Sequence, residues 1–222
     1  MIIIGHRGAR GLAPENTLVG LQKAIEHGVD EIEFDVRTTV DDVVVLHHDA
    51  VLHDVSGTRL AIDRHTYADL VQHKPDLPRL VDIFDAIGKV IPLYIEVKPG
   101  VSVEPVIAAL EYALNHGFVA ADLRVGSYSQ AILREIHLTL PDITMIVIER
   151  WSGVRAGYRA RQLGTKRISM NQRWLWWGFV GPVSRSGWQL TAYTVNNPRQ
   201  AKSWQKMGLY GIVTDYPERF TS

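Results

Sequence analysis

The feature that most constrains the fold of this 222-residue chain is an alternation of short apolar runs with segments of helical length. The runs are rich in Val, Ile and Leu and are bounded by Gly, Pro or polar residues, which is typical of buried strands. Eight strands are expected, at Ile2–Gly5, Glu31–Val36, Leu93–Val97, Leu123–Ser127, Thr144–Ile148, Arg167–Met170, Leu190–Tyr193 and Gly211–Thr214. This order predicts an α/β fold with a parallel sheet closed as a (β/α)8 TIM barrel. A doubly wound open sheet is the structural alternative.

Helical segments are predicted between these strands. The first follows Pro14, with Asn16 as its expected N-cap and Gly28 as its end. The others are bounded by glycine or by a first-turn proline, and we place them at Val103–His116, Ser129–Leu138, Gly153–Leu163 and Pro198–Met207. Since no linker or low-complexity stretch divides the chain, a single domain over residues 1–222 is expected.

One stretch interrupts the regular alternation. Val43–Leu46 reads as an extra strand, and the residues up to Leu80 lack the barrel pattern. We interpret about residues 49–78 as a short insertion after the second strand, lying on the rim of the barrel. Loops of this length in a compact domain usually shape a site.

Composition limits the chemistry. The chain has no cysteine, so any metal must be held by oxygen or imidazole ligands. Lys plus Arg (24) equal Asp plus Glu (24), which argues against a nucleic-acid binder that works through bulk charge. The apolar start, Ile2 to Ile4, is too short for a signal peptide, and no charge-free stretch reaches membrane-spanning length. We therefore expect a cytoplasmic protein without stable membrane insertion.

Carboxylates lie within two of the predicted strands, toward their carboxyl ends. Glu33 and Asp35 share one face of their strand, about 6.6–6.8 Å apart. Glu96 and Lys98 share a face at the end of the next barrel strand. Because barrel enzymes place their sites at the carboxyl ends of strands, the three acids predict a site for one divalent cation, Mg²⁺ or Ca²⁺, with Mn²⁺ also suitable. A solvated strand face and a simple Glu96–Lys98 ion pair are the structural alternatives.

Two of the nine histidines stand out. His6 follows the first strand within Gly5-His6-Arg7-Gly8, and His48 closes the run that begins at Val43. An imidazole titrates near neutrality, so a pair beside a metal can act as acid and base in displacement at phosphorus. Either one alone would more often be structural. The remaining histidines that we considered, read as surface or capping residues, are His27, His53, His65, His73, His116 and His137.

Arg7 and Lys98 add positive charge beside the acids. Arginine suits bidentate contact with a phosphate, and lysine acts as a point charge. Carboxylates, a cation and two basic residues favour a phosphate diester over a neutral sugar.

Together these motifs resemble the glycerophosphodiester phosphodiesterase family. The matching stretches cover nearly the whole chain and are His6-Arg7-Gly8, Pro14-Glu15-Asn16-Thr17, Glu33-Phe34-Asp35-Val36, His48-Asp49, Glu96-Val97-Lys98, Tyr193–Asn196 and Gly211–Pro217. The resemblance implies a TIM-barrel hydrolase that releases an alcohol and glycerol 3-phosphate. It also implies that Glu33, Asp35 and Glu96 hold the cation, that His6 and His48 are the acid/base pair, and that Arg7 and Lys98 contact phosphate.

The chain departs from the family pattern at Tyr193, where Trp is usual, and at Leu77–Leu80, where Pro-Thr-Leu is typical. These departures bear on the glycerol pocket. The residues assign base to His6 and acid to His48 only as a working hypothesis, and they do not distinguish water from a substrate hydroxyl as the nucleophile. The oligomeric state is also open.

Three rival functions follow from the same residues. A lysophospholipase D or sphingomyelinase D activity would favour an aromatic rim, and Trp174, Trp176 and Trp177 are clustered. We favour ordinary packing between helix and barrel for these tryptophans. A phosphatidylinositol phospholipase C fits the acids poorly. A non-catalytic binder of phosphorylated ligands would need neither the histidines nor the acids.

Overall fold

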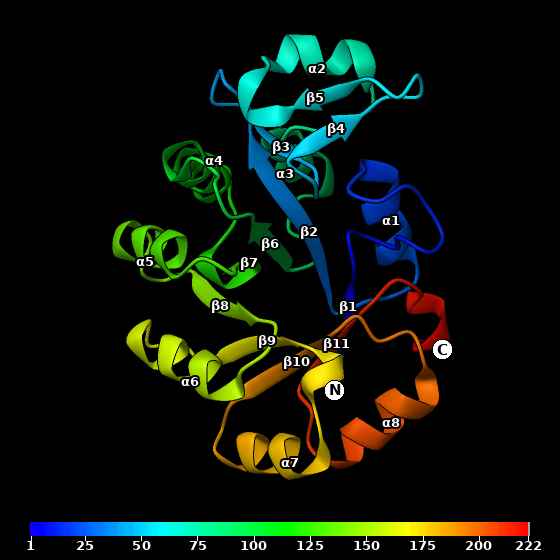
Figure 1. The fold of residues 1–222 in the computed structure, drawn as a ribbon, viewed down its shortest axis with the longest axis vertical. Helices are drawn as coiled ribbons and strands as arrows, with labels where there is room; N and C mark the ends of the chain where they lie inside the picture. Colours follow the sequence, from blue (N-terminus) through cyan, green and yellow to red (C-terminus); the bar gives the residue numbers. More distant parts are fainter. Residues whose placement is uncertain (222) are drawn as a thin grey trace.

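The computed structural model describes residues 1–221, and in it eight parallel strands close into a barrel (Figure 1). The strands are β1 (Ile2–Gly5), β2 (Glu31–Thr38), β6 (Leu93–Val97), β7 (Leu123–Ser127), β8 (Thr144–Glu149), β9 (Arg167–Asn171), β10 (Gln189–Tyr193) and β11 (Gly211–Thr214). Neighbours along the chain pair in parallel, and β1 pairs with both β2 and β11. This closure confirms the TIM barrel and excludes the open sheet.

Helices surround the barrel as an outer layer (Figure 1). They are α1 (Leu18–Glu26), α3 (Leu80–Ile87), α4 (Val103–Asn115), α5 (Gln130–Thr139), α6 (Gly153–Gln162), α7 (Trp177–Arg185) and α8 (Pro198–Lys206). The sequence pattern missed α3 and α7. The second contains Gly178, Gly181 and Pro182, which disfavour helix, so packing of Val180 on the barrel decides its structure.

The predicted cap of the first helix is wrong by one residue. Thr17 is the N-cap of α1, and its hydroxyl accepts a hydrogen bond from Gly20 N at 3.1 Å. Asn16 instead has a positive φ of 54° and turns its side chain toward the barrel.

Alternation along the strands separates two apolar layers. Ile32, Phe34 and Val36 of β2 are buried in the main apolar core beneath the helices. A smaller cluster fills the barrel interior, formed by Ile4, Tyr94, Ile146, Ile148 and Val213. The residues of β2 on the opposite face from its three apolar residues include the acids Glu33 and Asp35.

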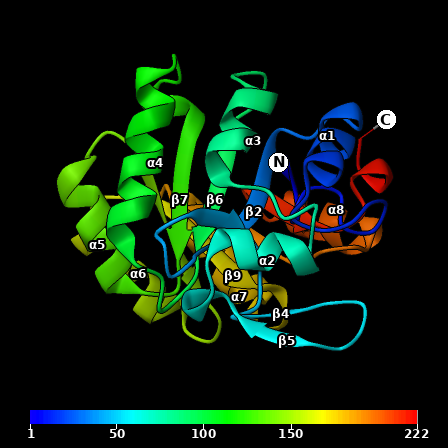
Figure 2. The same cartoon turned by 90° about the horizontal axis from the view of Figure 1, so that it is seen from above.

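The chain makes its excursion after β2. Strand β3 (Val44–Leu46) pairs antiparallel with β2, and a separate hairpin of β4 (Val51–His53) and β5 (Arg59–Ala61) projects from one end of the barrel (Figure 2). Helix α2 (Tyr67–His73) covers the hairpin, which packs around its own small core of Val45, Leu52, Leu60, Ile62, Leu70 and Leu77. Four short 3₁₀ turns complete the fold: η1 (Ile62–Arg64), η2 (Ala120–Asp122), η3 (Gln172–Trp174) and η4 (Pro217–Arg219).

A buried ion cluster occupies the amino end of the barrel. Glu31 begins β2, and its carboxylate accepts two hydrogen bonds from Arg167, at 3.0 and 2.8 Å. Arg124 Nε lies 2.9 Å from the same carboxylate. This cluster is at the opposite end from the acids predicted to bind a cation, so it is a structural element.

The tryptophan segment is not interior packing. Trp174, Trp176 and Trp177 are 48%, 59% and 76% exposed, so our packing interpretation is wrong. The physical reason is that Leu175 and Val180 supply the buried contacts of this segment, leaving the indoles to point outward. Among residues 1–221, no helix combines the length and apolarity needed to cross a bilayer.

Candidate active site

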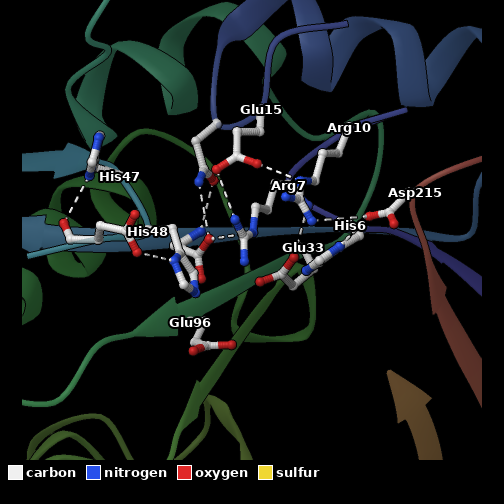
Figure 3. A network of polar contacts seen from close by, with 12 residues as sticks. His6, Arg7, Arg10, Glu15, Glu33, His47, His48, Glu96 and Asp215 are labelled. Atoms are coloured by element: carbon white, nitrogen blue, oxygen red, sulfur yellow. Dashed lines mark hydrogen bonds and ion pairs between the residues drawn. The ribbon is translucent and has the colours of Figure 1, made fainter. Parts of the chain in front are cut away.

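A cavity of about 310 Å³ opens at the carboxyl ends of the barrel strands. It is the place where all seven predicted site residues meet. The residues lining it include His6, Arg7, Glu33, Asp35, His48, Glu96 and Lys98. Figure 3 shows the two imidazoles on either side of the carboxylates in this view. Residues as far apart in the sequence as His6 and Lys98 thus converge on one site because their strands end at the same mouth.

Three carboxylates form the floor of this cavity. Asp35 and Glu96 are register partners on the adjacent strands β2 and β6, and Glu33 lies two residues earlier on β2. One oxygen from each acid lies within 4.8 Å of the others. Glu33 and Asp35 are almost completely buried, so their charges are poorly hydrated.

Two cations from the chain partly neutralise the acids. Lys98 Nζ lies 2.5 Å from Asp35 Oδ1 and also pairs with Glu96. Arg7 Nε lies 3.1 Å from Asp35 Oδ2, and Arg7 Nη1 donates to Glu15 at 2.8 Å. Burial works to lower the pKa of Lys98, but Glu96 and Asp35 raise it above its usual value. The ammonium is therefore held charged beside the acids.

Full ionisation of the other two acids is disfavoured, because the two cations do not offset all three charges. Burial, together with Asp35 and Glu96, raises the pKa of Glu33 well above its ordinary value. Burial and Asp35 raise the pKa of Glu96 to about 7. Burial also works to raise the pKa of Asp35, but Lys98 and Arg7 outweigh it and lower that pKa. Three hard oxygen donors whose joint ionisation lacks sufficient positive charge from the chain fit a divalent cation.

Asn16 fixes the orientation of Asp35 and was not predicted as a site residue. Its Nδ2 donates to Asp35 Oδ2 at 3.0 Å, and its Oδ1 accepts from Asp35 N at 3.0 Å. Asn16 is buried, and its positive φ is one that Asn tolerates better than most residues. The available signal was its position in the Pro14–Thr17 motif.

The backbone of the first loop also contacts the acids. Arg7 N donates to Glu33 Oε2 at 2.9 Å, which requires the chain to turn sharply after β1. Gly8 permits this turn, with a φ of 85°, and a Cβ there would lie 2.5 Å from the backbone of Gly20.

His6 is oriented from the last barrel strand. Its Nδ1 donates to Asp215 Oδ1 at 2.6 Å, which directs Nε2 away from that carboxylate. Asn196 Nδ2 donates to Asp215 Oδ2 at 2.7 Å. Burial opposes ionisation of Asp215, but the hydrogen bonds from His6 and Asn196 lower its pKa. Asp215 is thus an ionised positioning residue for His6.

His48 is held by the rim of the insertion. Its Nδ1 donates to Asp49 Oδ1 at 2.7 Å, and its backbone carbonyl accepts from Arg37 Nε at 2.9 Å. Burial lowers the pKa of His48 below its ordinary value despite the carboxylates nearby. His47 turns to the other side and contacts the Asp49 carbonyl (Figure 3).

Tyrosines form the wall opposite the first loop. The hydroxyls of Tyr128 and Tyr193 form a hydrogen bond of 2.7 Å, and Tyr193 Oη donates to the Glu149 carbonyl at 3.1 Å. Arg150 lines the same side of the cavity. Tyr193 therefore presents a fixed hydroxyl within the wall at the position where the sequence departs from the family pattern.

Comparison with known proteins assigns this arrangement. The profile of the glycerophosphoryl diester phosphodiesterase family matches residues 6–219. The chain belongs to this family. Membership places it among the phosphoric diester hydrolases.

The match extends over whole relatives. The Bacillus subtilis (strain 168) protein YhdW is 28% identical over 98% of this chain and 96% of its own length. A glycerophosphodiester phosphodiesterase of the same organism is 25% identical over 99% of this chain and 85% of its length. The solved structure of an Oleispira antarctica phosphodiesterase with the product sn-glycerol-3-phosphate has a TM-score of 0.87, at 24% identity over 99% of this chain and 94% of that one. It shows that the fold is shared.

Proposed function

We propose that this family member hydrolyses glycerophosphodiesters to an alcohol and glycerol 3-phosphate, with Glu33, Asp35 and Glu96 holding one divalent cation. His6 and His48 are the proposed acid/base pair, and Arg7 and Lys98 the proposed phosphate contacts. The observation that carries the proposal is that these seven side chains line one cavity at the barrel mouth. The Oleispira antarctica relative, described with sn-glycerol-3-phosphate, supports the choice of substrate class.

The donor set favours Mg²⁺ or Ca²⁺, with Mn²⁺ also suitable, because all three ligands are carboxylate oxygens. When bound, such a cation offsets negative charge on the phosphoryl oxygens. The chain supplies further positive charge through Arg7 and Lys98. Both side chains already contact Asp35, so they share that acid with the cation site.

In the proposed reaction, His6 Nε2 takes the proton of the nucleophile as the bond from its oxygen to phosphorus forms. The bond from phosphorus to the alcohol oxygen breaks, and His48 Nε2 donates a proton to that oxygen. Asp215 and Asp49 stabilise the protonated imidazoles and hold Nδ1 of each. The reverse division of roles uses the same geometry. The nucleophile is either water or the neighbouring glycerol hydroxyl, which would give a cyclic phosphate first.

The test is release of glycerol 3-phosphate from several glycerophosphodiesters, with Mg²⁺, Ca²⁺ or a chelator. Cation-dependent release supports the proposal, and release that survives the chelator would disprove the role of the acids. A non-catalytic binder would instead bind glycerol 3-phosphate, as measured by calorimetry, and would show no turnover of glycerophosphodiesters. Reaction in ¹⁸O-water, with analysis for a cyclic phosphate, identifies the nucleophile.

One observation favours a second candidate. The exposed Trp174 and Trp176, together with Trp151, line a groove beside the cavity, and such a groove suits an acyl chain. A lysophospholipase D or sphingomyelinase D activity would then use the same polar site. Comparing turnover of glycerophosphocholine with that of lysophosphatidylcholine and sphingomyelin separates these candidates.

A further inference from the structure

The tryptophans of this chain are concentrated at one place on its surface. Of the six, four are exposed, and all four lie in the segments between β8 and α6 and between β9 and the first residue of α7. Trp151 and Trp174 meet edge to face at 5.4 Å, and Trp176 and Trp177 do so at 6.1 Å. Val154, 87% exposed, lies in the same groove. We name this surface the tryptophan rim, defined as Trp151, Val154, Trp174, Trp176 and Trp177.

The tryptophan rim adjoins the mouth of the active site. Trp151 follows Arg150, which lines the catalytic cavity, and Trp174 lies three residues after Asn171, which also lines it. Because both loops leave the carboxyl ends of barrel strands, the tryptophan rim and the cavity open at the same end of the barrel. A flat surface that covers the rim would therefore lie against the mouth.

Charge is divided unevenly along the chain although the total is balanced. Residues 150–214 contain eleven Lys and Arg and no Asp or Glu, so all 24 acids lie elsewhere. The buried members of this set, Arg159 and Arg167, pair with Glu149 and Glu31. Arg155 of α6 is exposed but pairs with Glu149. Arg150 and Arg173 are exposed on the loops of the tryptophan rim. The rim is thus apolar and positively charged.

We propose that the tryptophan rim docks on the surface of an anionic phospholipid bilayer and turns the barrel mouth toward it. Tryptophan is the residue enriched at membrane–water interfaces, where its ring lies among the headgroups. Basic residues nearby are attracted to anionic lipids. The strength of binding at a membrane surface increases with both the buried apolar area and this electrostatic attraction. Four clustered indoles distinguish this surface from a nucleic-acid site, whose affinity depends on phosphate contacts.

The proposal does not depend on the hydrolase activity, so the two can fail separately. The experiment is flotation of the whole protein with vesicles, in chelator so that no lipid is cleaved. One set of vesicles is phosphatidylcholine alone, and the other contains added phosphatidylglycerol. Binding to the second set at low salt, a blue shift of tryptophan emission and release at high salt are expected.

Two substitutions with matched controls test the residues. Trp176→Ser with Trp177→Ser is expected to weaken binding at least tenfold. Val119→Ser with Leu138→Ser, which removes exposed apolar groups near the amino ends of the strands, should have no effect. Arg173→Gln should weaken binding about fivefold. Lys166→Gln, which changes an exposed cation just before β9, is its control.

Turnover of a water-soluble glycerophosphodiester and the melting temperature report on folding and should be unchanged in every variant. Binding equal to that of the unsubstituted chain in the tryptophan variant would overturn the proposal, as would absence of binding to the anionic vesicles. Equal binding to phosphatidylcholine alone would overturn the anionic preference. Tight binding of a DNA duplex that is insensitive to Trp176 and Trp177 would identify a nucleic-acid surface instead.

Discussion

His6 and Asp215 are joined by a 2.6 Å hydrogen bond across 209 residues of sequence, from the first barrel strand to the residue that follows the last. This contact sets which nitrogen of His6 faces the cavity. A carboxylate can only accept from Nδ1, so the proton-accepting lone pair is at Nε2. The proposed base thus depends on a residue that is not among those lining the cavity.

Asp215→Asn should keep the fold and lower kcat about 10- to 100-fold. The amide can donate to Nδ1, which would move the proton to Nε2 and remove the base. The measurement is the pH profile of kcat. Its fall on the acidic side, which reports protonation of the base, should disappear or move to another pH. Asp215→Glu, which retains the carboxylate, should recover part of the activity. A variant with the unchanged rate and profile would show that Asp215 does not position His6.

His48→Ala should lower turnover by about 100- to 10,000-fold, the usual contribution of a general acid or base. Cation binding should be unaffected, because His48 is not one of the three clustered ligands. Calorimetry with Ca²⁺ and single-substrate kinetics measure the two effects separately. His47→Ala, at the half-buried neighbour, is the control, and near-normal rates in the His48 variant would refute the assignment.

Glu96→Gln should weaken cation binding by at least tenfold, since it removes one of three charged oxygen ligands. Glu15→Gln is the matched control. Glu15 contacts Arg7 and Arg10 at the edge of the site and is not among the clustered ligands. Isothermal titration with Mg²⁺ and Ca²⁺ compares the two variants, and equal affinities would place the cation elsewhere.

The stability gained from a cation should increase with pH. Glu96 has a pKa of about 7 in the folded chain and an ordinary value of 4.5. Between these values the folded state binds more protons than the unfolded state, so the cation-free protein loses stability as pH rises. A bound cation relieves this penalty by favouring the ionised carboxyl.

Melting temperatures with chelator and with Ca²⁺, measured at several values from pH 5 to pH 8, give this gain directly. Glu96→Gln should flatten the dependence. A gain that decreases with rising pH would contradict the coupling of this acid to the cation.

Glu31→Gln tests the ion cluster at the other end of the barrel. Removing the charge leaves Arg167 buried beside a neutral amide, which should lower the free energy of unfolding by about 3–5 kcal/mol. Chemical denaturation measures this loss. The kcat of the folded fraction should not change, because Glu31 does not line the cavity; a change in kcat would show that the two ends are coupled.

Strand positions could be predicted from sequence because buried parallel strands are continuous apolar runs with clear boundaries. All eight barrel strands lie where the pattern placed them, within one or two residues at each end. Helix α7 could not be found, because Gly178, Gly181 and Pro182 obscure its periodicity. Its existence depends on contacts with the barrel that no local pattern encodes.

The seven site residues were selected from motifs and strand ends, and they do line one cavity, although their roles stay predictions. What local sequence could not show was the support around them. The pattern predicted Asn16 as a helix cap, but its side chain makes two hydrogen bonds with Asp35 instead. Asp215 and Asn196 act on His6 only because the barrel closes. Whether Trp176 is buried or exposed likewise depends on how α7 packs.

The closure of β1 against β11 has a consequence for synthesis of the protein. During translation, His6 is made long before Asp215, which lies 209 residues later in the chain and holds its imidazole. A growing chain that already contains the acids and His48 still lacks an oriented His6. On the proposed role of His6, hydrolysis should begin only once β11 has docked against β1, so a chain interrupted before Asp215 should not hydrolyse phosphodiesters.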